Sequence, residues 1–271
     1  MELGLSGRRA LVSGGSQGIG RAVVETLLGE GTSVALCARE SEGVETAVRE
    51  LQDLGPVVGH VCDFADDQAV RRWVALAAAA LGGIDILVSN ASASGQHGQG
   101  REPWEVNFRV DVLGCVALCE AAKPYLERSE AAAIVQIGTI TAIEHHDVPI
   151  SPSYGALKAA TINYMAQLAQ RWGPLGIRAN TVSPGPILVE GRKWDSLRER
   201  RPAIFERDRD AHPMKRMGTA QEVANMVAVL ASPAASWVNG AHLVVEVATP
   251  SASDSEDSGM RRRRGLVDTN A

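Results

Sequence analysis

The sequence is poor in cysteine, has no long apolar run and carries no excess of positive charge. Four cysteines are too few and too scattered for a disulfide framework; they are Cys37, Cys62, Cys115 and Cys119. No stretch approaches the ~20 consecutive apolar residues of a membrane-spanning helix, and the opening residues lack the apolar core of a signal peptide. We therefore expect a cytoplasmic protein with no membrane partner.

The balance of charge narrows the class of partner further. The 271 residues carry a net charge of −5, with 45% apolar and 22% charged residues, which is ordinary for a soluble globular chain. A negative balance argues against nucleic acid as the main partner. The length suits one large α/β domain or two small ones.

Short apolar strands alternate with helical patterns along most of the chain. A strand at 9–13, a helix at 21–30 and a strand at 33–38 form a βαβ unit around a glycine-rich turn. The later expected helices are 42–54, 66–81, 104–126 and 154–172, and the later expected strands are 57–62, 84–88, 133–137, 177–182 and 243–248. This alternation predicts a single-domain, Rossmann-type α/β fold, a doubly wound parallel sheet with helices on both faces.

No linker divides this pattern, so we expect one domain over residues 1–249. Residues 188–212 are rich in Arg, Glu and Asp and predict one or two exposed helices. From residue 250 to 271 the chain is polar, with four consecutive arginines at 261–264, and its composition predicts a disordered tail. We interpret these arginines as part of a solvated tail rather than as a nucleic-acid or membrane patch.

Gly14, Gly18 and Gly20 form a G-x-x-x-G-x-G turn between the first strand and the first helix. Glycines at such a turn let the backbone approach a pyrophosphate, and the following helix N-terminus offers unpaired N–H groups to the anion. The alternative is a turn that only packs a strand on a helix. Its place inside a βαβ unit favours nucleotide binding.

Tyr154 and Lys158 are four residues apart, so they share one face of the expected helix. Tyrosine has a pKa of about 10, and bringing that pKa to about 7 takes roughly 4 kcal/mol. One cation at ~4 Å supplies roughly that much at an effective dielectric of ~20. The pair can therefore transfer protons, provided that the rest of the chain builds a site around it.

Taken in order, these motifs resemble those of the short-chain dehydrogenase/reductase family over about residues 5–245. The family sequence N-N-A-G after the fourth strand appears as residues 89–92, Ser-Asn-Ala-Ser. Its P-G motif after the sixth strand is Pro184-Gly185, and residues 213–224 resemble its lead into the last helix. Within the family, the chain resembles the 3-oxoacyl-[acyl-carrier-protein] reductase-like members.

The resemblance implies a nicotinamide dinucleotide cofactor. The residues expected to bind it are Gly14, Ser16, Gln17, Gly18, Ile19, Gly20, Arg39, Asp63, Phe64, Asn90, Ala91, Tyr154, Lys158, Pro184, Gly185 and Ile187. At the end of the second strand, neutral Ala38 followed by Arg39 suits a 2′-phosphate, which favours NADP(H) over NAD(H). Gln17 argues against NADP(H), because many family members that prefer NADP carry a basic residue at this position. Asp63 resembles the acid that lies beside the adenine ring.

The same resemblance assigns catalytic roles. Tyr154 exchanges a proton with the carbonyl or alcohol oxygen, while Lys158 lowers the pKa of the tyrosine and binds the nicotinamide ribose. Thr139 takes the place of the family serine, with Thr141 as the alternative. Asp111 replaces an asparagine that holds a water in the family. It can hold such a water and also places a second charge near Lys158, which predicts an altered pH dependence.

Two further segments bear on the substrate and on assembly. His145, His146 and Asp147 lie where substrates bind in the family, and we expect them to border the pocket rather than to bind a metal, so no metal site is predicted. Residues 186–212 form the expected substrate loop. The family ending V-D-G-G reads Val-Glu-Val-Ala at 245–248, in a region that often packs at a tetramer interface.

We therefore expect an NADP(H)-dependent oxidoreductase for a small ketone or secondary alcohol, with Tyr154 as proton donor or acceptor. A 3-oxoacyl thioester bound to an acyl carrier is one candidate substrate, and the expected assembly is a homodimer or homotetramer. The alternative is a catalytically impaired dinucleotide-sensing or structural protein of the same family. Departures from the family pattern at Ser92, Asp111 and Thr139 favour that alternative, and the intact Tyr154–Lys158 pair argues against it.

Overall fold

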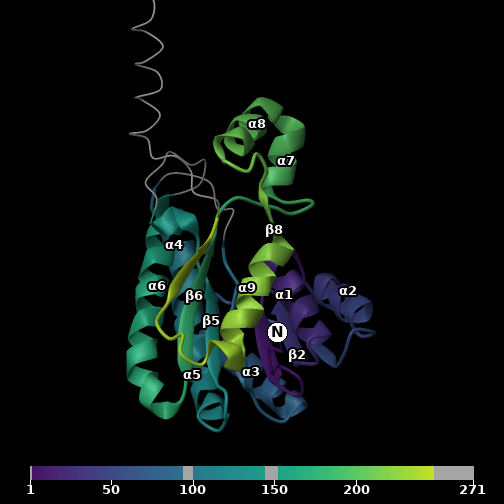
Figure 1. Ribbon diagram of the computed structural model, residues 1–271, viewed down its shortest axis with the longest axis vertical. Helices are drawn as coiled ribbons and strands as arrows, with labels where there is room; N and C mark the ends of the chain where they lie inside the picture. Colours follow the sequence, from purple (N-terminus) through teal and green to yellow (C-terminus); the bar gives the residue numbers. More distant parts are fainter. Residues whose placement is uncertain (1, 94–99, 144–151, 247–271) are drawn as a thin grey trace, which may run out of the picture.

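The computed structural model describes residues 2–93, 100–143 and 152–246. Its centre is a parallel sheet of seven strands in the order β3-β2-β1-β4-β5-β6-β9 (Figure 1). The strands are β1 (Arg9–Ser13), β2 (Ser33–Ala38), β3 (Val57–Val61), β4 (Ile86–Ser89), β5 (Ala133–Ile137), β6 (Arg178–Pro184) and β9 (His242–Val245). The expected tail from residue 250 and the run His145-His146-Asp147 lie outside the described residues.

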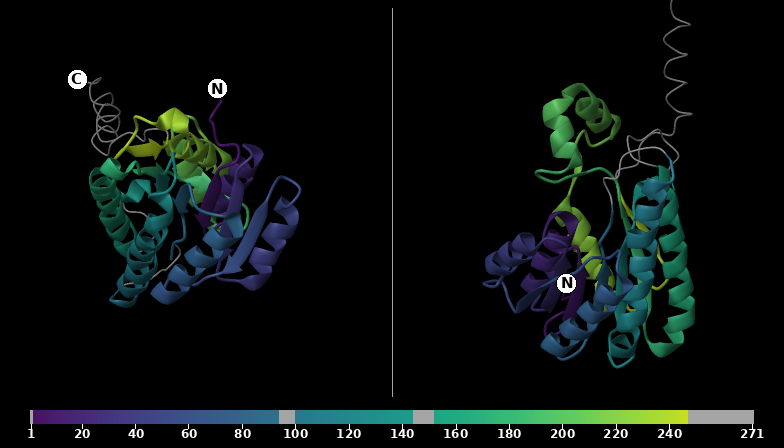
Figure 2. Two further views of the ribbon diagram at one scale, coloured as in Figure 1. Left: turned by 90° about the horizontal axis from the view of Figure 1, so that it is seen from below. Right: turned by 180° about the vertical axis from the view of Figure 1, so that it is seen from behind.

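Helices cover both faces of the sheet (Figure 2). One face packs against α1 (Gly18–Gly29), α2 (Ser41–Leu51) and α9 (Ala220–Ala231). The other packs against α3 (Asp67–Leu81), α5 (Gly114–Leu126) and α6 (Pro152–Trp172). Because both faces are buried, the central strands β4 and β5 are apolar almost throughout and fully buried. The predicted doubly wound α/β fold is confirmed.

The helix predicted at 104–126 is interrupted. It consists of α4 (Glu102–Asn107), a π-helical turn η1 (Phe108–Leu113) and α5 in direct succession. A π turn is wider than an α turn and shifts the faces that the following residues present, and such turns are frequent at functional sites. Asp111, a charged residue, is the buried residue of this turn. Apolar periodicity alone carries no signal for such a turn.

The glycine turn is locked to the end of β4. The Asn90 side-chain amide donates to the carbonyl oxygens of Ser13 and Gly14 at 2.9 and 3.0 Å. The Ser13 hydroxyl accepts the backbone N–H groups of Asn90 and Ala91 at 2.9 and 3.0 Å. Four hydrogen bonds therefore join the ends of the two neighbouring strands β1 and β4.

The three glycines of the turn are required for different structural reasons. Gly14 and Gly18 have φ values of +64° and +60°, which other residues rarely adopt. A Cβ on Gly20 would lie 2.1 Å from the Gly14 oxygen and 2.4 Å from the Asn90 side-chain nitrogen. The turn therefore leaves space for nothing larger than hydrogen at Gly20.

Two helices stand above the carboxyl ends of the strands (Figure 1). They are α7 (Lys193–Arg200) and α8 (Pro202–Ala211), which pack against each other. A short parallel pair, β7 (Ile187–Leu188) and β8 (Gly218–Thr219), joins them to the rest of the molecule. The structure confirms two helices in the charged segment.

We expect Gly20→Ala to destabilise the fold, because the added methyl group cannot fit without moving Asn90 or the turn backbone. Overpacking of this kind costs about 1–3 kcal/mol or more in free energy of unfolding. Gly29→Ala, at the other end of α1, is the matched control, since a Cβ there meets nothing within 4 Å. Urea unfolding of both variants measures the difference. Equal stability of the two would contradict this account of the turn.

Candidate active site

The predicted site residues gather where the strands end. Parallel strands bring their carboxyl ends to one edge, and the ligand crevice of doubly wound folds lies there. The N-terminal part of α6 contributes Tyr154 and Lys158 at this edge, and Thr139 follows the end of β5 by two residues. The residues that follow β1, β2, β3 and β4 contribute the glycine turn and the predicted cofactor residues.

The ammonium group of Lys158 is buried and has two partners. Its ammonium donates to the carbonyl oxygen of Ile137 at 2.9 Å and lies 3.2 Å from Asp111 Oδ1. The same nitrogen lies 6.0 Å from the centroid of the Tyr154 ring. Burial acts to lower the pKa of Lys158, but attraction from Asp111 and Tyr154 and the hydrogen bond with Asp111 raise it above its ordinary value. The lysine therefore carries a fixed positive charge beneath the phenol.

Tyr154 departs from the sequence-based expectation. Burial raises the pKa of its phenol above the ordinary value, and the negative charge of Asp111 raises it further. Lys158 lowers that pKa, as expected, and so do hydrogen bonds with Thr139 and Ser92, but these effects are smaller in sum. Lys158 thus acts in the expected direction, but burial and Asp111 outweigh it and the net pKa is raised.

Thr139 contacts the phenol directly, while Thr141 lies behind it. Thr139 is buried and hydrogen-bonds Tyr154. The hydroxyl groups of Thr139 and Thr141 lie 3.0 Å apart, and Thr139 Oγ1 accepts the Thr141 backbone N–H at 3.3 Å. Thr139 thereby starts the short 3₁₀ helix η2 (Ile140–Ala142). Of the two candidates for the family serine, Thr139 is the one with a hydrogen bond to the phenol.

Asp111 ties three segments together. It is 2% exposed in the π turn, pairs with Lys158 on α6, and accepts the backbone N–H of Ala93 at 3.1 Å through Oδ2. The second charge that the sequence predicts near Lys158 is thus in direct contact with it. This carboxylate also fixes the chain that follows β4, beside Ser92.

The predicted cofactor residues lie along the edge with different environments. Gln17 precedes α1 without a side-chain cap, and the first turn of α1 has no acidic residue, so the helix N-terminus is open to an anion. Arg39 is exposed and makes no hydrogen bond or ion pair with any residue in the described parts of the chain. Exposed Asp63 accepts the Ala65 N–H at 2.9 Å. The N-terminus of α1 therefore suits a pyrophosphate, Arg39 suits a 2′-phosphate, and Asp63 suits an adenosine.

Phe64 was predicted to bind the cofactor, but its side chain lies in the core. Its side chain is buried in the core, with its ring centroid 6.0 Å from that of Trp73. Its backbone carbonyl packs closely over Gly114, where a Cβ would come within 2.7 Å. Any contact between Phe64 and a cofactor therefore has to come from its backbone.

Pro184, Gly185 and Ile187 occupy the turn that leads from β6 into β7. Pro184 is buried in the last position of β6, and the Gly185 N–H donates to the Val245 oxygen at 3.1 Å. Ile187 packs partly buried against the core. Ser16 and Ile19 flank the glycine turn and are half-buried. All of these positions border the same edge of the sheet.

Two contributors were missed by sequence reasoning. Ser92 bonds the phenol although it was read only as a departure from a family glycine. Gly155 lets the start of α6 pack against η2, because a Cβ there would lie 2.4 Å from the Thr141 oxygen. The glycine between Tyr154 and Ala156 was the available signal for this close approach.

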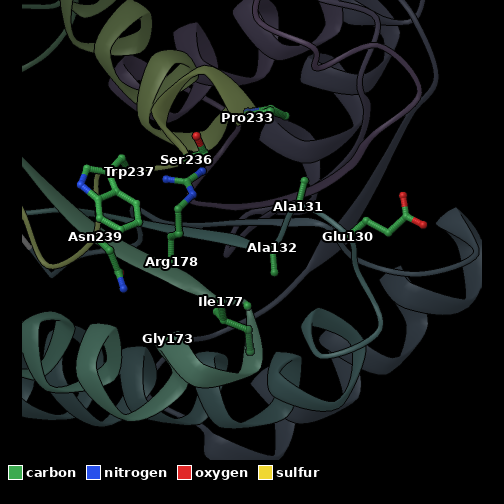
Figure 3. Close-up of a pocket in the computed structure, with 11 residues that line it drawn as sticks. Glu130, Ala131, Ala132, Gly173, Ile177, Arg178, Pro233, Ser236, Trp237 and Asn239 are labelled. Atoms are coloured by element: carbon green, nitrogen blue, oxygen red, sulfur yellow. The ribbon is translucent and has the colours of Figure 1, made fainter.

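A cavity of about 510 Å³ lies at the opposite end of the sheet, where β5 and β6 begin (Figure 3). The guanidinium of Arg178 lines it but is occupied by the carbonyl oxygens of Leu230, Ser232 and Val238 at 2.8, 3.0 and 3.3 Å. Trp237 lies at the rim and is 99% exposed. This cavity therefore lies at the end of the sheet away from Tyr154.

Two kinds of feature are absent from the described residues. No helix in these ranges is long and apolar enough to cross a membrane. No group of three or more His, Cys, Asp or Glu side chains there could hold a metal ion.

Known proteins resemble this chain along nearly its whole length. The family model described as "Enoyl-(Acyl carrier protein) reductase" matches residues 14–247. Isoepoxydon dehydrogenase of Penicillium expansum is 37% identical over 248 residues, which cover 90% of this chain and 95% of that protein.

Solved structures agree with the sequence matches. L-sorbose reductase from Gluconobacter frateurii, complexed with NADPH and L-sorbose, has a TM-score of 0.85 at 27% identity and covers 92% of this chain and 98% of that one. A short-chain dehydrogenase from Burkholderia cenocepacia in complex with NADP has a TM-score of 0.82 at 31% identity, covering 89% and 97%. The matches do not single out the 3-oxoacyl reductase-like members, so that subtype stays a prediction. The fold, the ordered motifs and these likenesses together establish that the chain belongs to the short-chain dehydrogenase/reductase family, as an NAD(P)-dependent oxidoreductase acting on CH–OH or C=O groups.

Proposed function

We propose that the protein is an NADPH-dependent carbonyl reductase in which Tyr154 donates the proton to the substrate oxygen. The observation that supports this most is the group of side chains at the phenol: Tyr154 hydrogen-bonds Thr139 and Ser92, and the Lys158 ammonium lies 6.0 Å from the centroid of its ring. A protonated tyrosine in such a group can donate its proton to a carbonyl oxygen during reduction. We therefore propose reduction as the direction of the reaction.

The chain's own residues supply the other elements of the reaction. When bound, the reduced nicotinamide supplies the hydride. Thr139 hydrogen-bonds the phenol and is placed to hold the substrate carbonyl against it, with Ser92 on the same oxygen. Lys158 holds a positive charge beneath the ring and stabilises the phenolate that remains after proton donation. Asp111 keeps that lysine charged and in place.

We further propose that NADP(H) is preferred over NAD(H), and Arg39 supports this choice. It is exposed at the end of β2, follows neutral Ala38, and has no partner in the described parts of the chain that would compete for a phosphate. A guanidinium binds phosphate oxygens in a two-pronged manner. Two of the similar structures hold NADPH or NADP.

For the substrate we propose a small hydroxylated ketone and its secondary alcohol. The similar proteins named after isoepoxydon and L-sorbose support this class. A 3-oxoacyl thioester is the second candidate, favoured by the description of the family model. Against it, three of the arginines on α7 and α8 that could meet an acidic carrier are paired locally: Arg198 with Asp195, Arg207 with Asp208 and Arg209 with Asp210. Assembly into a homodimer or homotetramer and a cytoplasmic location stay predictions.

The proposed reaction is tested by NADPH oxidation with hydroxylated ketones, cyclic hydroxyketones and 3-oxoacyl thioesters. We expect turnover with at least one class, and a loss of about 10²–10⁴ in kcat for Tyr154→Phe with NADPH binding retained. Tyr164→Phe is the matched control, because Tyr164 is half-buried on the same helix α6. Tight NADPH binding without turnover on any substrate would favour the sensing or structural alternative.

The cofactor preference is tested by Arg39→Ala. We expect this change to weaken NADPH binding by about tenfold or more, since it removes a charged contact worth about 1.5–3 kcal/mol. NADH binding should change little, because NADH lacks the 2′-phosphate. Arg49→Ala, an exposed arginine on α2, serves as the control. Equal weakening of NADPH and NADH would refute the assignment.

The role of Asp111 predicts the pH dependence of the reaction. Its negative charge raises the pKa of Tyr154, so Asp111→Asn should lower that pKa. In kcat/KM for reduction, the alkaline fall, where the phenol loses its proton, should then move down by about one pH unit. Glu120→Gln, an exposed carboxylate on α5, should leave the profile in place. An unshifted pH profile for Asp111→Asn would show that Asp111 does not influence proton transfer by Tyr154.

A further inference from the structure

A buried glutamine next to the active site takes no direct part in the proposed reaction. Gln136 lies on β5 and is 1% exposed. Its side-chain Nε2 donates to the carbonyl oxygen of Ile137 at 2.8 Å and to the hydroxyl of Thr161 at 3.1 Å. The second bond crosses from the sheet to α6, the helix that carries Tyr154 and Lys158. Both N–H groups of the amide are therefore used, one on each element.

The carbonyl oxygen of Ile137 is shared between Gln136 and Lys158. It accepts the Lys158 ammonium at 2.9 Å as well as the Gln136 amide at 2.8 Å. A carbonyl oxygen has two lone pairs, so it can bind both donors at once. The ammonium group is thus fixed to an oxygen that Gln136 also holds.

The hydroxyl of Thr161 connects Gln136 to the main chain of Lys158. Thr161 is 1% exposed and lies three residues after Lys158 on α6. Its Oγ1 accepts the Gln136 N–H and donates to the backbone oxygen of Lys158 at 2.9 Å. A hydroxyl group can do both, because it has one donor and two lone pairs. Gln136 is therefore linked to Lys158 twice, through Ile137 to its ammonium and through Thr161 to its backbone.

The acceptor atom of the same amide indicates that packing alone does not explain a glutamine at this position. Gln136 Oε1 is enclosed and has no hydrogen-bond partner in the described part of the chain. A buried acceptor without a partner opposes folding. An apolar side chain avoids this penalty, as Ile134 does two residues earlier in the same core. The two bonds that Gln136 donates are therefore the feature that distinguishes it from an apolar residue.

The ion pair with Asp111 restrains the Lys158 ammonium less closely in direction. Asp111 Oδ1 lies 3.2 Å from Lys158 Nζ, and the centroid of the Tyr154 ring lies 6.0 Å from it. Attraction between two charges varies slowly with distance, whereas a hydrogen bond weakens steeply when it is bent. The bond to Ile137 therefore does more than the ion pair to set where the ammonium group points.

We propose that Gln136 and Thr161 position Lys158, so that its ammonium group stays close beneath the phenol of Tyr154. Both act through the lysine and are positioning residues rather than catalytic ones. The consequence for the rate rests on the proposed function, in which Lys158 stabilises the phenolate that remains after Tyr154 donates its proton. Without the bonds of Gln136 and Thr161, the ammonium group samples positions farther from the phenol and stabilises this phenolate less.

The first test follows Lys158 itself and needs no substrate. The chain contains four lysines, which are Lys123, Lys158, Lys193 and Lys215. Labelling of the folded protein with acetic anhydride, read by mass spectrometry, gives the rate of reaction at each of them. Thr161→Val keeps the shape of the side chain but removes the hydroxyl. In this variant we expect Lys158 to react about fivefold faster or more relative to Lys123, because a hydrogen bond that restrains it is lost.

Two further variants separate this effect from a general loss of stability. Thr161→Ser keeps the hydroxyl, so Lys158 should react as in the wild type. Thr26→Val removes a hydroxyl with the same kind of partners on α1, where Thr26 donates to the Ala22 oxygen and accepts from Gln221, both at 2.8 Å. It should leave the rate at Lys158 unchanged. Equal rates at Lys158 in the wild type and in Thr161→Val, or an equal increase in Thr26→Val, would overturn the proposal.

The second test measures the reaction of the same variants. We expect kcat for ketone reduction to fall about tenfold in Thr161→Val, since a small displacement of a catalytic group costs this much or more, while KM for the ketone changes little. Thr161→Ser should restore kcat, and Thr26→Val should leave it at the wild-type value. A fall in kcat that serine does not rescue, or a rise in KM alone, would contradict the positioning role. If no substrate turns over, the proposed reaction fails, yet the labelling experiment still decides whether Lys158 is restrained in this way.

A double variant tests whether the two residues act through their mutual bond. Gln136→Met removes the amide donors from a side chain of similar length, so it should accelerate labelling of Lys158 and lower kcat at least as much as Thr161→Val. It also replaces Thr161→Val if that variant does not fold. Because Gln136→Met already breaks the bond to Thr161, adding Thr161→Val should lower kcat no further. Effects that multiply would show that the two residues act separately and would overturn the proposal.

Discussion

A single buried ammonium group organises the active end of this molecule. Lys158 holds Ile137 at the end of β5 and Asp111 in the π turn, and it sits below Tyr154 on α6. A buried cation is tolerated only when it is paired and hydrogen-bonded, because desolvation otherwise costs several kcal/mol. The three segments therefore have to meet at this point, and the interruption of the helix at η1 is what allows Asp111 to reach it. The pairing of Lys158 therefore determines both how these segments pack and which charges lie near Tyr154.

Much of the frame could be predicted because it follows from local rules. Alternating strand and helix patterns give a parallel sheet, and a parallel sheet brings its carboxyl ends to one edge, so Gly14, Asn90 and Tyr154 had to be neighbours. The glycine spacing also carries its own physics, since Gly14 and Gly18 adopt positive φ and Gly20 has no space for a Cβ. These features depend on residue type and chain order, both of which are visible in the sequence.

The site itself was harder to predict because it depends on burial. A tyrosine and a lysine four residues apart predict a lowered tyrosine pKa, but the solvent excluded around Tyr154 and the second charge on Asp111 reverse the sign. The close approach of Gly155 to Thr141, the bond from Ser92 and the inward-facing Phe64 likewise result from long-range packing. The periodicity of apolar residues predicts which face of a helix or strand is buried. It does not predict which polar side chains will be buried next to one another.

Under the proposed function, the strand order separates cofactor binding from substrate binding in space. Arg39 and Asp63 follow β2 and β3 on one side of β1, whereas Thr139 and Gly185 follow β5 and β6 on the other side of β4. The four bonds between Asn90, Ala91, Ser13 and Gly14 join the two halves at the centre. Over evolutionary time, one half can therefore change its choice of dinucleotide while the other changes its choice of carbonyl compound. A chain built in this way can acquire a new substrate without rebuilding the site that binds its reductant.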